Sequence, residues 1–92
     1  MQVKGFKDVS GQEFIAEVIN CYEHSLVIKN PICLVPTEKG MMPVPYLIST
    51  QEEVTLNRFA LMFDPFDVED NIENFYKEKF GGIVQPPTGL IL

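Results

Sequence analysis

The sequence predicts a small, mainly β protein: a strongly bent antiparallel barrel of five strands, followed by one C-terminal α-helix. Three observations support this fold class. Five short apolar or alternating segments are separated by turn-forming residues. The only helical period lies in the last third of the chain. The 92 residues are too few to build two separate cores.

The first expected strand covers residues 12–20, directly after Gly11. It alternates acidic and apolar residues with a period of two, placing Glu13 and Glu17 against Phe14, Ala16 and Val18. Residues 21–25 then predict a tight polar turn. The second expected strand, residues 26–28, is apolar on both faces and therefore buried.

Lys29, Asn30 and Pro31 interrupt this strand, and a third is expected over residues 32–35, before a turn at 36–40. Residues 41–49 and 54–63 are the remaining two strand candidates. Pro43 and Pro45 remove two N–H donors from the same side of the first of these. That strand is therefore expected at a sheet edge, with only one side able to carry a full ladder.

The helix is expected over residues 64–81. Asp64 and Pro65 supply an N-cap and a first-turn proline, and Asp67 occupies the capping-box position. Apolar side chains then fall on one stripe: Val68, Ile72, Phe75, Tyr76 and Phe80. The expected organisation is a single domain, with a barrel at 1–63, the helix at 64–81 and an uncharged apolar tail at 82–92. The tail is either a frayed end or an arm that packs on this domain or a neighbour.

The seven basic and thirteen acidic residues leave a net charge of −6. Residues 1–63 carry −2 of this charge and residues 64–92 carry −4. This balance argues against a strongly cationic nucleic-acid-binding surface, so any such site is expected on the barrel. The acidic face of the helix is either solvated or a docking surface for a basic protein partner.

The sequence shows no catalytic constellation, so we expect no enzyme and no cofactor. Cys21 and His24 form only a two-ligand fragment, which is short of a zinc site. The glycines make no phosphate-binding loop. There is no apolar run long enough for a membrane span and no signal-peptide pattern, and two cysteines fit a reducing interior. A cytoplasmic location is therefore expected.

The segment GQEFIAEVINCYEHSLVIKN, residues 11–30, resembles the first signature of the Sm-like (LSm) family, especially its bacterial Hfq branch. The positions that match are Gly11, Phe14, Ala16, Val18, Lys29 and Asn30. Residues 44–49 resemble the second signature. The resemblance implies a bent five-stranded barrel that assembles into a homo-oligomeric ring by pairing edge strands. It also implies binding of single-stranded RNA by base stacking near the pore.

A second resemblance covers nearly the whole chain. The patterns at residues 11–18, 29–31 and 80–86 resemble small uncharacterised proteins of marine, T4-like cyanophages. This resemblance implies the cytoplasm of an infected bacterium as the compartment, and brings no established function with it.

The leading functional expectation is a non-catalytic ring protein that binds single-stranded nucleic acid, RNA ahead of DNA, in phage RNA or DNA processing. The Sm-like resemblance places the stacking positions on His24 and Tyr46, where the second signature's lysine is replaced by Pro45. Lys29, Asn30 and Arg58 are the expected contacts to phosphate or base edges. Each has a structural alternative: a turn residue for His24, a core or interface residue for Tyr46, a turn or bulge for Lys29 and Asn30, and an intersubunit ion pair for Arg58. The alternative function is an adaptor ring that docks a protein partner through its acidic helix.

Overall fold

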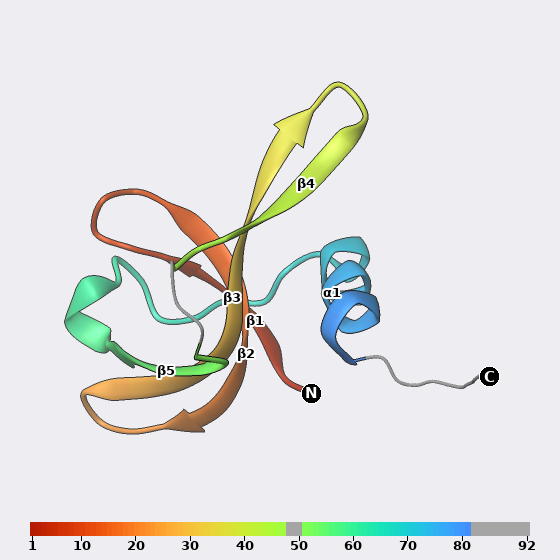
Figure 1. Cartoon of the computed structure of the whole chain (residues 1–92). Helices are drawn as coiled ribbons and strands as arrows, with labels where there is room; N and C mark the ends of the chain where they lie inside the picture. The colour runs from red at the N-terminus through yellow and green to blue at the C-terminus, as the bar shows by residue number, and fades with distance from the viewer. Residues whose placement is uncertain (48–50, 82–92) are drawn as a thin grey trace.

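A computed structural model describes residues 1–47 and 51–81 of the chain. It contains five strands, a 3-10 turn (η1), an α-helix (α1) and a π-helical end (η2), in the order β1 Val3–Lys7, β2 Glu13–Cys21, β3 Ser25–Thr37, β4 Gly40–Pro45, β5 Glu53–Asn57, η1 Arg58–Ala60, α1 Asp70–Tyr76 and η2 Lys77–Gly81. The fold class predicted from the sequence is confirmed: one antiparallel five-stranded sheet carries a C-terminal helix (Figure 1). No helix of the described segments is long and apolar enough to cross a membrane.

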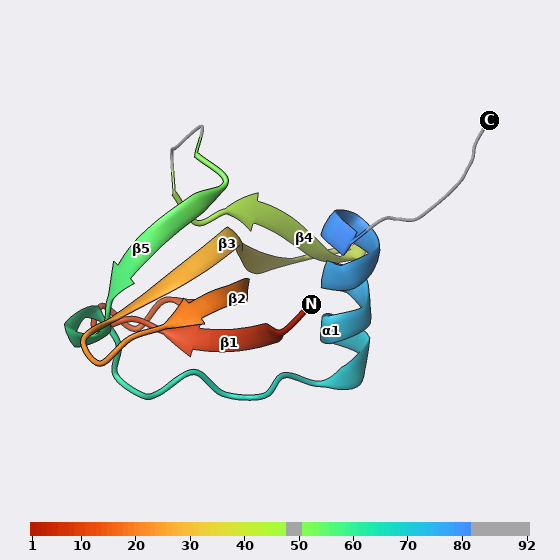
Figure 2. The same ribbon diagram turned by 90° about the horizontal axis from the view of Figure 1, so that it is seen from below.

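The sheet is organised around β3, the longest strand. The strands β1 to β4 are hydrogen-bonded in sequence order, and β5 also pairs with β3. β5 lies against residues 25–29 of β3, whereas β4 lies against residues 32–37. The chain after η1 then returns along β1, through bridges between Asp8 and Leu61 and between Gly5 and Phe66. The strands therefore curl around one side of the sheet, while the β3–β4 hairpin projects away from the rest of it (Figures 1 and 2).

Individual strands differ from those expected. β1 was not predicted. The expected strands at 26–28 and 32–35 are one continuous strand, β3, and the strand expected over 54–63 ends at Asn57, where η1 begins. Residues 48–50 of the strand expected over 41–49 lie outside the described residues, as does the tail at 82–92.

The prediction that β4 is an edge strand agrees with its pairing, since within the described residues it pairs with β3 alone. The N–H of Tyr46 donates to the carbonyl of Pro31 at 3.0 Å. Because N–H groups alternate in direction along a strand, the nitrogens of Pro43 and Pro45 face away from β3. The two prolines thus sit where no ladder donor is needed, and they protect the open edge.

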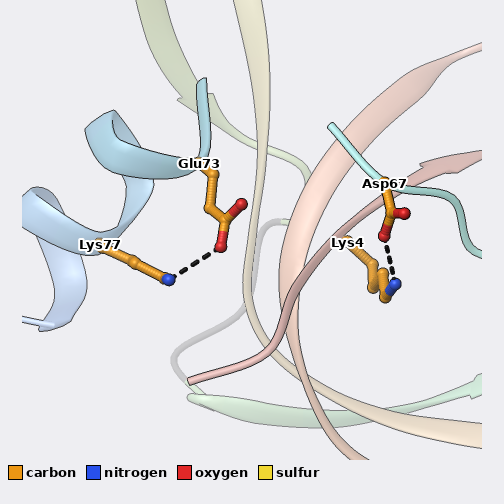
Figure 3. Close-up of polar contacts among 4 residues, drawn as sticks. All are labelled: Lys4, Asp67, Glu73 and Lys77. Atoms are coloured by element: carbon orange, nitrogen blue, oxygen red, sulfur yellow. Dashed lines mark hydrogen bonds and ion pairs between the residues drawn. The ribbon is translucent and has the colours of Figure 1, made fainter. Parts of the chain in front are cut away.

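The expected start of the helix at residue 64 is wrong, because α1 begins at Asp70. Phe66 exchanges two backbone hydrogen bonds with Gly5, of 2.7 and 2.9 Å, which holds this part of the chain extended. Asp67 is not a capping residue but an ion-pair partner of Lys4 on β1, at 2.5 Å (Figure 3). Gly5 is required here, since any Cβ would collide with the ring of Phe66. Tertiary pairing has therefore overridden the local cap.

Two apolar clusters fill the two faces of the sheet. The first lies inside the curl of the strands and consists of Phe6, Phe14, Ala16, Val18, Leu26 and Ile28. The second lies between the sheet and α1 and consists of Val3, Ile15, Ile32 and Tyr76. The alternation of β2 thus serves both layers, and the helix covers the face that the curl leaves open.

A bulge in β3 joins these layers. Glu17 pairs with Lys29 and Ile15 pairs with Ile32, so β3 has one residue more than β2 across this interval. Asn30, inside the bulge, has a left-handed φ of 50°. The buried hydroxyl of Tyr76 accepts the Glu17 N–H at 3.0 Å and donates to the Lys29 carbonyl at 2.6 Å. It thus replaces the ladder hydrogen bond that the bulge breaks.

We predict that Tyr76→Phe lowers the free energy of unfolding by about 1–3 kcal/mol, because it leaves the Glu17 N–H and the Lys29 carbonyl without their partner. Urea unfolding followed by circular dichroism measures the change. Tyr22→Phe, which alters an exposed tyrosine, is the matched control. Equal stability of the two variants would contradict the bridging role of the Tyr76 hydroxyl.

Candidate nucleic-acid interface

The five residues expected to bind nucleic acid do not form one cluster. His24 and Arg58 lie together at the end of the sheet where β2 turns into β3 and β5 runs into η1. Lys29 and Asn30 lie at the bulge, where Lys29 pairs with Glu53 at the other end of β5. Along the strand, four residues separate the turn end of the sheet from the bulge, a distance of roughly 13 Å. Tyr46, just after β4, is partly buried against the core cluster.

Lys29 and Asn30 both make contacts that stabilise the fold. The Lys29 ammonium pairs with Glu52 at 3.5 Å. The N–H of Asn30 donates to the Glu52 carbonyl at 3.1 Å, and its own carbonyl lies 3.0 Å from the Tyr76 hydroxyl. The structural alternative for this segment, a bulge, is therefore present. The positive charge of Lys29 is partly compensated by Glu52.

Tyr46 is partly buried and packs against the core cluster inside the curl. Its ring stacks on Phe14, with centroids 3.9 Å apart and planes at 17°. Its hydroxyl donates to the Oδ2 atom of Asp8 at 2.7 Å. Burial, with the hydrogen bond to Asp8 as a second cause, raises the pKa of Tyr46 to about 12. With one ring face covered by Phe14 and the hydroxyl engaged, Tyr46 is a partly buried residue that packs against the core.

Asp8 is the buried acid that organises this part of the core. Besides Tyr46, its carboxylate accepts hydrogen bonds from the Ser10 hydroxyl at 2.5 Å and from the N–H groups of Ser10 and Gln12. The hydrogen bonds from Ser10 and Tyr46 lower the pKa of Asp8 from 3.8 to about 2, against the opposing effect of burial. The carboxylate is thus held ionised in the turn between β1 and β2.

His24 stands at the exposed end of the sheet with an aromatic neighbour that the sequence did not single out. Phe59, the middle residue of η1, is 78% exposed. The rings of His24 and Phe59 lie nearly parallel, at 14°, with centroids 6.1 Å apart. Tyr22, in the same turn as His24, is also exposed. We call these three side chains, Tyr22, His24 and Phe59, the aromatic end. It lies on the opposite side of the molecule from α1 (Figures 1 and 2).

Arg58 fixes the backbone of the aromatic end. Its N–H donates to the His24 carbonyl at 3.0 Å, and its Nε donates to the Tyr22 carbonyl at 2.8 Å. The Asn57 side chain accepts the Phe59 N–H at 2.9 Å and so begins the 3-10 turn. The guanidinium also lies 3.6 Å from a carboxylate oxygen of Asp64. Arg58 therefore supplies a cation beside the aromatic pair while it holds η1 against the β2–β3 turn.

Phe59 could have been identified as an exposed aromatic residue from the alternation of inward and outward positions in the sequence. Val54 and Leu56 are half-buried and point inward, so the same alternation places Phe59 outward, with Thr55 and Asn57. A large aromatic side chain at a position that faces away from the core is not explained by core packing.

Other chemistry is not evident in the described part of the chain. Residues 1–47 and 51–81 contain no group of three or more His, Cys, Asp or Glu side chains that could hold a metal ion. Cys21 is exposed and Cys33 half-buried, and both are free thiols. A scan against protein-family models finds no match for the chain, and a search of curated proteins finds none either.

We predict that Asp8→Asn removes part of the acid sensitivity of folding. A carboxylate whose pKa is lowered on folding stabilises the native state above the unfolded pKa, and this stability is lost as the pH falls from about 4 to about 2. Thermal unfolding across this pH window should show a shallower decline in the variant. Asp70→Asn, at an exposed position on α1, should keep the decline of the unmodified protein; the same slope in all three proteins would contradict the assignment.

Proposed function

We propose that the protein is a non-catalytic module that binds single-stranded nucleic acid, RNA in preference to DNA, at the aromatic end. The observation that carries the proposal is the exposed, nearly parallel pair of rings formed by His24 and Phe59. Bases of a single strand stack on exposed aromatic side chains, and each such contact contributes about 1–3 kcal/mol.

The spacing of the two rings supports this function. A base held between two parallel rings needs them about 7 Å apart, which is twice the roughly 3.4 Å separation of stacked bases. The centroids of His24 and Phe59 are 6.1 Å apart. Both residues lie on short turns, so a small outward movement of either ring admits a base between them. Stacking on the outer face of Phe59 needs no movement at all.

The charges favour a single strand over a duplex. Duplex-binding proteins neutralise many phosphates with lysine and arginine, whereas this chain carries a net charge of −6. Near the aromatic pair Arg58 provides one cation, which Asp64 partly compensates at 3.6 Å. The site is thus suited to ligands held mainly by stacking, with few phosphate contacts. Its salt dependence should be shallow.

The proposal includes self-assembly into a homo-oligomeric ring, which would repeat this weak site around one axis and raise the total affinity. β4 and β5 each have one edge without a strand partner among the described residues. Pairing the free edge of β4 with that of β5 in the next copy is heterologous, so it generates a closed ring when the rotation permits. Pro43 and Pro45 leave carbonyls but no N–H groups at their positions on the β4 edge, so this ladder would be incomplete.

We predict that Phe59→Ala weakens binding of a fluorescent single-stranded RNA by about 5- to 150-fold, the equivalent of losing one stacked base. Fluorescence anisotropy at low salt measures the affinity, with single-stranded DNA of the same sequence in parallel. Phe75→Ala, at an exposed position on α1, is the matched aromatic control. Lys29→Ala should change the affinity less than about twofold, because Lys29 lies away from the aromatic end and pairs with Glu52. Absence of binding to both nucleic acids, or an equal loss in the Phe75 variant, would contradict the proposal.

The ring is tested separately by light scattering at micromolar concentration. A mass corresponding to several copies supports assembly, and Val44→Glu serves as a comparison because it alters the edge strand without adding a proline. A monomeric mass would remove the ring from the proposal and leave nucleic-acid binding by the single chain to be judged by the anisotropy measurement.

A further inference from the structure

A second surface lies on the other side of the molecule, between α1 and the β3–β4 hairpin. Two adjoining cavities, of about 280 and 250 Å³, share Leu34, Met41 and Ile72 in their linings. Together they form one open channel, which we call the helix–hairpin groove. Its apolar lining comes from β2, from both strands of the hairpin, from the chain before α1 and from the helix, and it includes Ile32, Leu34, Met41, Val68, Ile72 and Phe75.

The strand register explains why these side chains face the helix. Leu34 lies opposite Pro43, and Pro36 lies opposite Met41, so the residues at these positions share one face of the hairpin. The neighbouring residue Cys33 points to the other face and packs against the core inside the curl. The groove face of the hairpin is incompletely covered, since Met41 is 56% exposed. Phe75, on the helix side, is also exposed at its rim.

The polar rim of the groove is acidic. Glu13, from the start of β2, and Glu69, at the N-cap of α1, line the larger cavity, and neither cavity is lined by lysine or arginine in the described part of the chain. Asp67 and Glu73 nearby are compensated by Lys4 and Lys77 (Figure 3). By contrast, Glu13 and Glu69 take part in none of the ion pairs formed within residues 1–47 and 51–81. Two carboxylates without a close ion-pair partner therefore stand beside an apolar floor, with Lys7 as the cross-strand neighbour of Glu13.

We propose that the helix–hairpin groove is the docking site for a protein partner that presents apolar side chains flanked by lysine or arginine. The apolar floor supplies affinity when it is desolvated, and the carboxylates select and orient a cationic segment. Met41 adapts to the shape of the inserted side chains, as unbranched thioether side chains do at other peptide-binding surfaces. The proposal is independent of the nucleic-acid function, because the aromatic end lies on the opposite side of the molecule.

The charge pattern distinguishes this partner from two other occupants. A second copy of the chain offers few free cations to an acidic rim, because Lys4, Lys29, Arg58 and Lys77 are already paired with carboxylates. The chain's own residues 82–92 are apolar but contain no charged residue, so they leave Glu13 and Glu69 unused. A basic, apolar segment is the occupant that satisfies both the floor and the rim.

The test uses the full-length protein and a fluorescent synthetic peptide of alternating leucine and lysine, with a leucine and glutamate peptide for comparison. Only the lysine peptide should bind. Glu69→Lys and Met41→Ser should each weaken its binding by about tenfold, because the first reverses a rim charge and the second removes apolar floor. Glu78→Lys, exposed on η2, and Met62→Ser, exposed near η1, are the matched controls and should change binding less than about twofold.

Four outcomes would overturn the proposal. The first is equal binding of both peptides, and the second is an equal loss in the variants and their controls. The third is displacement of the lysine peptide by a peptide of residues 82–92, which would assign the groove to the chain's own tail. The fourth is a dimer in light scattering that Met41→Ser dissociates, which would assign it to a second copy. Phe59→Ala should leave peptide binding intact, so failure at the aromatic end is distinguishable from failure at the groove.

Discussion

The hydroxyl of Tyr76 in the β3 bulge is the contact on which the rest of the architecture depends. β3 has to change partners half-way, from β5 over residues 25–29 to β4 over residues 32–37. The extra residue at the bulge permits that change, but it leaves an N–H of β2 and a carbonyl of β3 without each other. Tyr76 satisfies both groups from the helix. The same two hydrogen bonds therefore complete the sheet and fix α1 against its open face.

Fixing the helix in this way creates the two surfaces on which the functional proposals rest. The N-terminal half of β3 leads from the turn that carries His24, and its C-terminal half forms one wall of the helix–hairpin groove. The two halves differ in their charge surroundings, because residues 64–92 carry −4 of the net charge. Glu13 and Glu69 line the groove, whereas Arg58, paired with Asp64, lies at the aromatic end. A single bent strand thus connects the two surfaces for which binding is proposed.

The sequence predicted elements wherever local pattern and tertiary pairing agree. The alternation of β2 and the prolines of β4 are such cases. The helix start is the opposite case: the Asp64–Pro65 cap is worth about 1 kcal/mol, and the two backbone bonds between Gly5 and Phe66, with the ion pair of Lys4 and Asp67, outweigh it. No local sequence pattern predicts a pairing partner about sixty residues away. The strand β1 was not predicted for a related reason. Its segment VKGFK is short and contains two lysines and a glycine, so it shows little strand propensity.

The candidate site shows the same limit for aromatic residues. Tyr46 and Phe59 both lie in segments with strand patterns, yet Tyr46 is partly buried against the core and Phe59 is exposed. Tyr46 is held against the core because its hydroxyl donates a hydrogen bond to Asp8, which is distant in sequence. Phe59 has no polar group and gains nothing from water, so leaving it exposed forgoes about 1.5–3 kcal/mol of burial. The free energy of folding is small for chains of this size, and an exposed ring adds little to it. The parallel alignment of Phe59 with His24, beside a fixed arginine, is the basis on which base stacking is proposed for this exposed ring.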